Sequence, residues 1–347
     1  MLRLTLGFLA GAALTAVLYT VLPLFSSPPP SPLISEAAQQ SMARVREDLA
    51  PHMGAYLSGD VPEQRAILDE HFYAPRIAIA RQRYPVTETP LEINGVYTEV
   101  FTPAGGISPA NAGRVLINLH GGAFTYGARS GGRLESIPVA ATAGMKVISV
   151  DYRQGPEHRF PAASEDVATV YRHLLQTYAP ENIGIFGCSA GGLLTAQSVA
   201  WFDANDLPQP GAIGIFCSGA GQYGTGDAAV ITRAFGTALG EDGEVAYFEG
   251  QDLGDPLVLP QDHPALLARF PPTLLITSTR DGALSTAAIT HQRLVGAGVR
   301  ANLHVYEGLH HFFFADTDLP ESEHLFQVIA RFFDSELGGG GNTGVAP

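Results

Sequence analysis

Residues 187–191, Gly-Cys-Ser-Ala-Gly, form a G-x-S-x-G motif between an apolar run at 182–186 and a helix-like run at 192–202. A serine between a strand and a helix is typical of a nucleophile elbow, in which small neighbours permit a tight turn that exposes the Ser189 hydroxyl. The alternative role of Ser189 is a helix N-cap. Since the chain holds 39 glycines, such a short motif carries a high false-positive risk, and the partners of Ser189 must decide.

A serine nucleophile needs a base that takes its proton and an acid that orients the base. In proteins with such an elbow, the three residues follow one another as serine, acid and histidine. The histidines in the last part of the chain are His291, His304, His310, His311 and His324. Three of them fall within predicted helices or a strand. His310 and His311 lie in the expected loop after the last strand, and one of them is the candidate base.

Asp281 is the candidate acid, because it follows an apolar run at 273–277 that predicts the penultimate strand. Its alternative role is that of a turn residue, since Asp-Gly is a common turn pair. The position of Asp281 between the serine and the candidate histidines favours the catalytic role. Glu307 and Asp255 are weaker alternatives.

An acyl-transfer site must also stabilise a tetrahedral oxyanion. His120-Gly121-Gly122-Ala123 follows a predicted strand directly, and glycines there allow backbone N–H groups to approach a substrate oxygen. We expect the N–H groups of Gly121, Gly122 and Ala190 to form the oxyanion hole, with Ala190 at the start of a helix whose dipole favours negative charge. The alternative is a Gly-Gly turn without a ligand.

The elements that must position these residues are short apolar runs that alternate with helix-like segments. Strands are predicted at 115–119, 145–150, 182–186, 212–217, 273–277 and 301–306, and helices at 134–143, 164–178, 192–202, 285–295 and 321–333. This alternation predicts an α/β fold with a mostly parallel central sheet flanked by helices. Ligands of such sheets bind at the carboxyl ends of the strands, where Ser189, His120, Asp281 and His311 are expected to meet.

The remaining segments suggest the domain organisation. Asp60-x-x-Glu63 is a capping-box-like helix start, and 91–103 alternates like a hairpin. The expected units are a leader with a proline-rich spacer at 1–34, a helical segment at 35–90, an α/β core at 91–336 with an irregular insertion at 222–268, and a flexible tail at 337–347.

Composition limits the partners. The formal net charge of −14 argues against nucleic acid, which binds clustered Lys and Arg. Cys188 and Cys217 do not make a disulfide framework; we expect buried free thiols, and their spacing suggests no metal site.

The N-terminus predicts export. Arg3 is followed by an uncharged stretch, 4–25, long enough to span a bilayer as a helix, and then by a run rich in proline, a stiff spacer. The positive start should stay cytoplasmic. An uncleaved signal anchor is favoured over a cleaved signal peptide, because the apolar stretch is long and no clean cleavage site precedes the prolines. The catalytic part would then face the periplasm or the outside, membrane-anchored if the segment is uncleaved and secreted if it is cleaved.

Several motifs in order resemble the hormone-sensitive-lipase-like branch of the α/β-hydrolase esterases. Residues 120–122 look like its H-G-G-G motif, and 151–166 (DYRQGPEHRFPAASED) resembles its D-Y-R-x-x-P-E-x-x-F-P-A-A-x-x-D signature. Residues 255–258 are similar to its D-P-x-x segment, and 308–313 to its G-M-x-H-x-F. The resemblance covers roughly residues 90–335.

The resemblance implies an α/β-hydrolase fold with a helical cap, made here by 35–90 and part of 222–268. It implies ester hydrolysis through an acyl-enzyme without cofactor or metal. It places the base at His311 rather than His310, and gives 151–166 a structural role beside the oxyanion loop.

This chain departs from the pattern at three positions: Ala123 replaces a glycine of the oxyanion motif, Cys188 stands where aspartate is frequent, and Ser285 replaces an acidic residue. These departures put substrate preference in doubt more than the reaction.

The sequence therefore predicts a serine carboxylesterase that acts on a small-molecule ester with short to medium acyl chains, with the triad Ser189, Asp281 and His311. Two alternatives stay open. An amidase or peptidase would use the same triad, and a non-catalytic relative would bind a small molecule.

Overall fold

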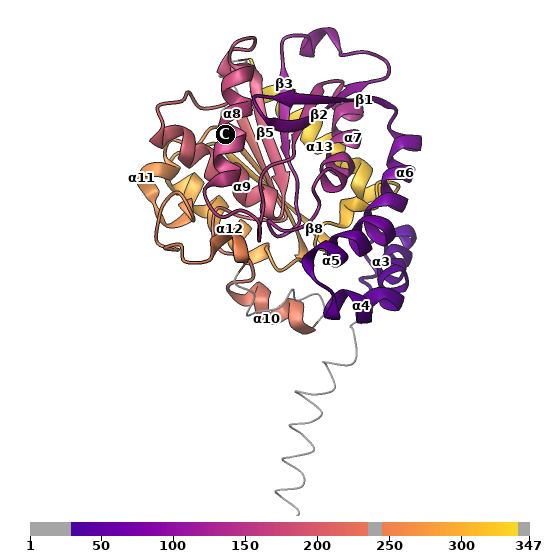
Figure 1. Cartoon of the computed structure of the whole chain (residues 1–347). Helices are drawn as coiled ribbons and strands as arrows, with labels where there is room; N and C mark the ends of the chain where they lie inside the picture. The colour runs from indigo at the N-terminus through magenta and orange to yellow at the C-terminus, as the bar shows by residue number, and fades with distance from the viewer. Residues whose placement is uncertain (1–28, 235–244, 339–347) are drawn as a thin grey trace, which may run out of the picture.

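The computed structural model describes residues 29–234 and 245–338. Its centre is an eight-stranded sheet in the order β1-β2-β4-β3-β5-β6-β7-β8 (Figure 1). β2 pairs antiparallel with β1 and β4, and all other neighbours are parallel. The strands are β1 Val86–Ile93, β2 Val96–Pro103, β3 Val115–Leu119, β4 Lys146–Val150, β5 Ile183–Cys188, β6 Ala212–Phe216, β7 Thr273–Arg280 and β8 Ala301–His310. The predicted α/β fold is confirmed.

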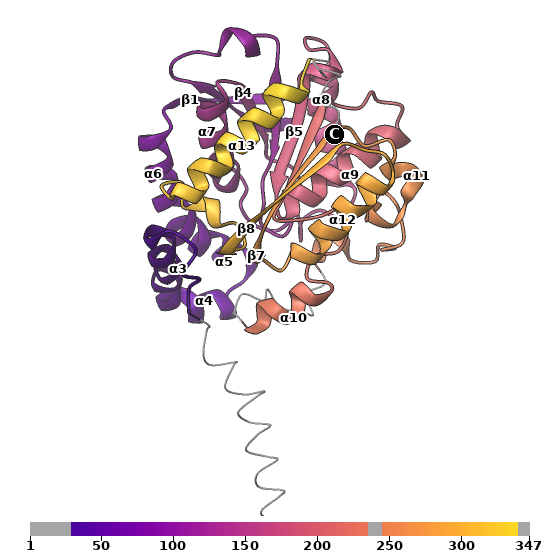
Figure 2. The same ribbon diagram turned by 180° about the vertical axis from the view of Figure 1, so that it is seen from behind.

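Helices cover both faces of the sheet because the buried strands alternate their apolar side chains between two cores. Leu116 belongs to the core beneath α7 (Ser130–Ala143) and α13 (Pro320–Glu336). Its neighbours Val115 and Ile117 belong to the core beneath α8 (Ala162–Leu174), α9 (Ala190–Ala204) and α12 (Leu284–Gly296). Figure 1 shows α8 and α9 in front of the sheet, and Figure 2, seen from behind, shows α7 and α13 in front.

Smaller helices gather at one end of the molecule. In both views α3, α4 and α5 lie at the lower end, and α10 lies at that end as well (Figure 2). Residues 36–83 form α3 Glu36–Leu49, η2 Ala50–His52, α4 Met53–Ser58, α5 Val61–Leu68, η3 Asp69–Tyr73 and α6 Ala74–Arg83. The later insertion contains α10 Asp227–Ala234, η6 Ala246–Phe248, η7 Pro260–Asp262 and α11 Pro264–Leu267. Short 3-10 turns also lie between the longer elements, at η4 Pro109–Asn111, η5 Pro180–Asn182 and η8 Phe313–Ala315.

Most predicted elements are confirmed, with shifted ends. The Asp60 side chain accepts a hydrogen bond from the Glu63 N–H and caps α5, as expected. The hairpin is confirmed, but β1 begins at Val86, so the helical segment ends before residue 90. β8 continues to His310, because it stays paired with β7 past an irregularity at Ser278/Arg280. The prediction that His310 lies in a loop is therefore wrong, and only His311 lies beyond the strand.

The predicted signal anchor or signal peptide lies mostly outside the described residues, as does most of the predicted tail. Within 29–234 and 245–338, no helix is both long and apolar enough to cross a bilayer.

Candidate active site

Ser189 stands at the sharp turn between β5 and α9. Its backbone has φ 57° and ψ −119°, a left-handed φ that costs a non-glycine residue of the order of 1–2 kcal/mol. The turn brings the backbone of β3 so close that a Cβ at Gly187 would lie 2.2 Å from the Leu119 carbonyl oxygen, and a Cβ at Gly191 only 1.7 Å from it. Both glycines are thus required by packing. Among the described residues, the Ser189 hydroxyl has no hydrogen-bond partner.

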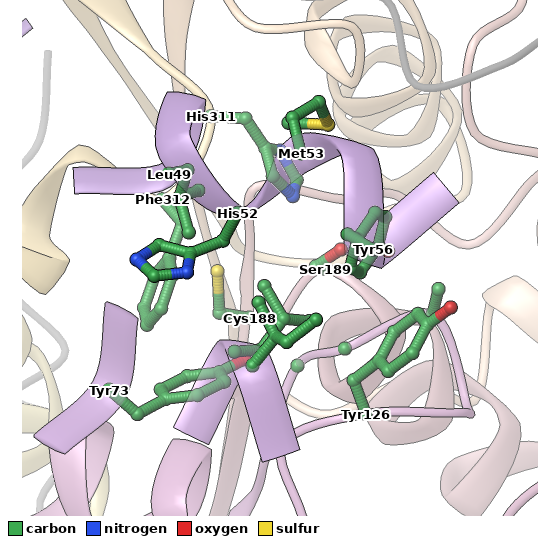
Figure 3. Close-up of a pocket in the computed structure, with 15 residues that line it drawn as sticks. Leu49, His52, Met53, Tyr56, Tyr73, Tyr126, Cys188, Ser189, His311 and Phe312 are labelled. Atoms are coloured by element: carbon green, nitrogen blue, oxygen red, sulfur yellow. The ribbon is translucent and has the colours of Figure 1, made fainter. Parts of the chain in front are cut away.

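His311 and Asp281 meet at the carboxyl ends of β8 and β7. The His311 Nδ1 lies 2.8 Å from Asp281 Oδ1, and Asp281 is fully buried. Because a carboxylate only accepts, Nδ1 carries the hydrogen and the other ring nitrogen, Nε2, has its lone pair free. The imidazole of His311 and the hydroxyl of Ser189 face the same pocket (Figure 3).

Asp281 is held as a carboxylate. Burial acts to raise its pKa, but the facing His311 and its hydrogen bond outweigh burial. The Ala283 N–H, at 2.9 Å, and the Thr277 hydroxyl, at 3.1 Å, also donate to it. The pKa of Asp281 therefore lies below its usual value. An ionised carboxylate at this place fixes the orientation and the tautomer of the His311 ring.

His310 is hydrogen-bonded to the backbone and, among the described residues, not to Asp281. Its Nδ1 lies 2.7 Å from the backbone oxygen of His311, and burial lowers its pKa. A neutral ring in this place stabilises the backbone at the end of β8, and of the two histidines only His311 is hydrogen-bonded to Asp281 among the described residues.

A pocket opens over Ser189. It has a volume of about 330 Å³, near the lower end of small-molecule sites. Figure 3 shows Met53 and Tyr56 reaching it from the helical segment before the sheet, and Tyr126 and Phe312 from the core. Its lining residues are Leu49, His52, Met53, Tyr56, Ile67, Leu68, Tyr73, Gly121, Gly122, Ala123, Tyr126, Cys188, Ser189, His311 and Phe312. Among the described residues no Asp, Glu, Lys or Arg lines it, so it suits a neutral, apolar ligand.

The oxyanion loop differs from the expectation at one residue. The N–H of Gly121 donates to Glu135 Oε1 at 2.9 Å, so it is not free for an oxyanion and its predicted role is wrong. Gly122 and Ala123 both line the pocket, and their N–H groups have no partner among the described residues. Ala190 is the first residue of α9, where the N–H lacks a helical partner. These three N–H groups are the available donors.

Glu135 is a site residue that sequence reasoning missed. It lies on α7 and is 2% exposed. Burial raises its pKa to about 8, although hydrogen bonds from Gly121, Asn118 and Cys188 act against that rise. The only sequence signal was an acidic residue within a helix otherwise rich in apolar and small residues.

The signature at 151–166 holds the oxyanion loop from outside. The Tyr152 hydroxyl donates to the His120 carbonyl at 2.7 Å, and the two rings stack at 4.3 Å. The Gly155 N–H donates to the carbonyl of Phe124 at 2.7 Å. His120 Nδ1 lies 2.8 Å from the Gly121 carbonyl, and burial lowers the pKa of His120. His120 is therefore a neutral structural residue.

Comparison with known proteins identifies the family of the chain. A family model described as alpha/beta hydrolase fold matches residues 116–315, more than half of the chain. The chain belongs to this α/β-hydrolase family. The esterase LipU of Mycobacterium tuberculosis (strain ATCC 25618 / H37Rv) is 32% identical over 247 residues, which are 68% of this chain and 82% of LipU. The carboxylesterase/phospholipase LipF of the same organism is 33% identical over 250 residues, 68% of this chain; the chain spans about two thirds (66%) of LipF.

Solved structures of α/β-hydrolases give the same result. The esterase E25 is 32% identical, with a TM-score of 0.78 over 90% of this chain and 97% of that one. An esterase from the bacterial hormone-sensitive lipase family is 24% identical, with a TM-score of 0.72 over 88% of this chain and 99% of that one. This second match supports the fold.

The two cysteines of this α/β-hydrolase are free and buried, as predicted. Cys217, Asp281 and His311 have potential ligand atoms within 4.8 Å of one another. Burial raises the pKa of the Cys217 thiol, and a thiol binds metal only as the thiolate. Since His311 and Asp281 already bond each other, the cluster fits proton transfer better than metal binding.

Proposed function

We propose that this protein is a serine carboxylesterase that hydrolyses esters with short to medium acyl chains through an acyl-enzyme. The observation that carries the proposal is that Ser189, on a strained elbow, shares one apolar pocket with His311, whose ring is bonded to the buried Asp281. The esterase names of the relatives support the ester class.

The proposed reaction has two halves. His311 Nε2 takes the hydroxyl proton while Ser189 Oγ attacks the ester carbonyl carbon, and the C=O bond becomes a single bond to an oxyanion. The N–H groups of Gly122, Ala123 and Ala190 stabilise that oxyanion. His311 then gives the proton to the leaving alkoxide, the C–O bond breaks, and the alcohol departs. Water repeats the sequence on the acyl-enzyme and releases the carboxylic acid.

The acyl chain fits the apolar pocket. A volume of about 330 Å³, with no Asp, Glu, Lys or Arg in the described part of its wall, accommodates a short hydrocarbon chain and excludes a charged one, because an unpaired charge is costly to desolvate.

The deciding experiment replaces Ser189 with alanine and measures kcat/KM on p-nitrophenyl esters from acetate to dodecanoate. We expect a loss of about 10⁴-fold or more on every ester, and in the wild type a rate maximum among the short and medium chains. Retained turnover in Ser189→Ala would reject the nucleophile. A matched ester and amide pair, with a faster rate on the amide, would favour an amidase instead.

We also propose that residues 1–34 export the catalytic part and anchor it to the membrane. The supporting observations are the uncharged stretch at 4–25 after Arg3 and the hydrogen bond from Arg280 Nη2 to the Pro29 carbonyl, 2.8 Å. Arg280 directly precedes Asp281, so Pro29 lies near the edge of the sheet that carries the pocket. We expect the full chain in the membrane fraction after alkaline carbonate washing and accessible to protease outside the cytoplasm. Recovery from the cytoplasm would contradict export.

A further inference from the structure

A buried carboxyl group stands behind the oxyanion loop, and the proposed reaction does not use it. Glu135 accepts hydrogen bonds from the Gly121 N–H through Oε1 and from Asn118 Nδ2 through Oε2, both at 2.9 Å. The backbone N–H of Cys188 also stabilises its charged form. One side chain of α7 thus contacts the oxyanion loop, the strand β3 and the residue before Ser189.

The partners of Glu135 are themselves fixed. The Asn118 side-chain oxygen accepts from the Ser149 hydroxyl at 2.9 Å, which leaves the amide nitrogen of Asn118 to face Glu135. A Cβ on Gly121 would lie 2.9 Å from the Cys188 carbonyl oxygen and 3.4 Å from Ser189 Cβ. The oxyanion loop therefore rests directly on the elbow, with no space for it to shift toward Ser189.

On its other side the loop is held by its own turn. Gly122 has φ 121°, and its carbonyl accepts from the N–H groups of Thr125 and Tyr126 at 2.9 and 2.8 Å. Between this turn and the Gly121–Glu135 bond, the N–H groups of Gly122 and Ala123 are left without partners among the described residues, and both residues line the pocket.

We propose that Glu135 is a positioning residue for the oxyanion hole: by holding the Gly121 N–H away from the pocket, it leaves the N–H groups of Gly122 and Ala123 to face the substrate oxygen. This inference rests on the proposed esterase function and deepens it. Glu135 does not contact the substrate and acts through the loop.

The position of Glu135 also gives the site a pH dependence. The titratable groups that interact electrostatically with it are Tyr73 of η3, Tyr152 after β4, Cys188 at the end of β5 and Cys217 after β6. Among the described residues it has no salt-bridge partner, and burial raises its pKa to about 8. Above that pH the Glu135 carboxylate carries a negative charge behind the developing oxyanion and opposes it by Coulomb repulsion.

The test compares Glu135→Leu, which removes the acceptor, and Glu135→Gln, which keeps an acceptor oxygen but cannot ionise. Ser136→Ala is the matched control, because Ser136 is the next buried residue of α7 and its hydroxyl has no partner among the described residues. The measurements are kcat and KM on p-nitrophenyl butyrate from pH 6 to 10, and the Ki of a trifluoromethyl ketone, which forms an oxyanion at the same place.

We expect Glu135→Leu to lower kcat by about 10²-fold and to raise the Ki of the ketone by about the same factor, the scale of losing one oxyanion donor. KM should change by less than about 3-fold. In the wild type, kcat/KM should fall as the pH rises through about 8, and this fall should be absent in Glu135→Gln.

Other results would overturn the inference. If both Glu135 variants match Ser136→Ala in kcat and Ki, or if Glu135→Gln keeps the same fall near pH 8, Glu135 does not position the oxyanion hole. A wild type without esterase activity would reject the proposed function together with the inference, so the two failures are distinguishable.

Discussion

At the scale of single residues, two adjacent histidines differ through what their Nδ1 atoms face. His311 Nδ1 faces the Asp281 carboxylate at 2.8 Å, whereas His310 Nδ1 faces a backbone oxygen at 2.7 Å. A carboxylate stabilises the imidazolium that forms when a base takes a proton, and an uncharged carbonyl does so far less. The difference of one position in the sequence therefore separates the proposed base from a residue that hydrogen-bonds only to the backbone.

This difference predicts the outcome of two alanine variants. His311→Ala should lower kcat/KM on p-nitrophenyl butyrate by about 10³-fold or more, since the serine loses its base. His310→Ala should keep kcat/KM within about 10-fold of the wild type, because it removes a hydrogen bond to the backbone and no part of the proton path. An equal loss in both variants would contradict the assignment.

Sequence reasoning identified the residues that chemistry requires and missed those that only packing brings in. The order of Ser189, Asp281 and His311 and the glycines beside Ser189 are local features of the chain. The pairing of Gly121 with Glu135, by contrast, depends on where α7 crosses the end of β3, and no spacing in the sequence encodes that crossing.

At the scale of elements, the same distinction explains the strand ends. Apolar runs predicted the buried parts of β3 to β6, whereas the polar Thr277-Ser278-Thr279 concealed the extension of β7. β8 is only partly buried and lacks a continuous apolar run. Pairing between these two strands continues past the irregularity at Ser278/Arg280. This pairing keeps the residues in strand conformation although their local propensity does not predict a strand, since β-propensity depends strongly on context.

The helical segment at 36–83 is tied to the core through Arg65 of α5. Its guanidinium donates to the carbonyls of Thr125 at 2.7 Å and Gly155 at 2.8 Å, and pairs with Glu157 at 2.6 Å. Glu157 lies in the signature segment, and Thr125 follows the oxyanion loop. One arginine of α5 thus contacts both the loop that follows the oxyanion glycines and the signature segment.

Removal of the Arg65 side chain should affect both the stability of the fold and the binding of substrate. We expect Arg65→Ala to lower the free energy of unfolding by about 2 kcal/mol, the scale of hydrogen bonds to a charged group, and to lower Tm by roughly 3 °C, the shift that follows for a chain of this length. KM should rise several-fold because the helices that line the pocket lose a contact to the core.

The control is Arg83→Ala, whose partner Glu323 lies in an exposed ion pair that contributes little to stability. Equal Tm values for the two variants would contradict the role of Arg65.

At the scale of the whole molecule, several buried ionisable groups lie near the same edge of the sheet, and their pKa values are shifted in opposite directions. Asp281 has a lowered pKa and Glu135 a raised one, while burial lowers the pKa of His120 and His310. Each of these shifts makes the stability of the fold depend on pH, because the folded and unfolded chains bind different numbers of protons.

Glu135 makes the folded state lose stability as the pH rises. Its pKa is 4.5 in an unfolded chain and about 8 in the fold, so between these values the folded state binds the extra proton. The free energy of unfolding therefore falls by up to ~1.4 kcal/mol per pH unit across that window. His120 and His310 act in the opposite direction around their ordinary values, but their contributions are the same in a Glu135 variant and cancel in the difference.

The difference in unfolding free energy between Glu135→Gln and the wild type should therefore grow in favour of the variant from pH 5 to pH 8, by a few kcal/mol in total. Urea unfolding at pH 5, 6, 7 and 8 measures it, and Ser136→Ala should show a constant difference over the same range. A constant difference for Glu135→Gln would mean that Glu135 ionises in the folded protein as it does in water, and that the burial of its carboxyl group is relieved in solution.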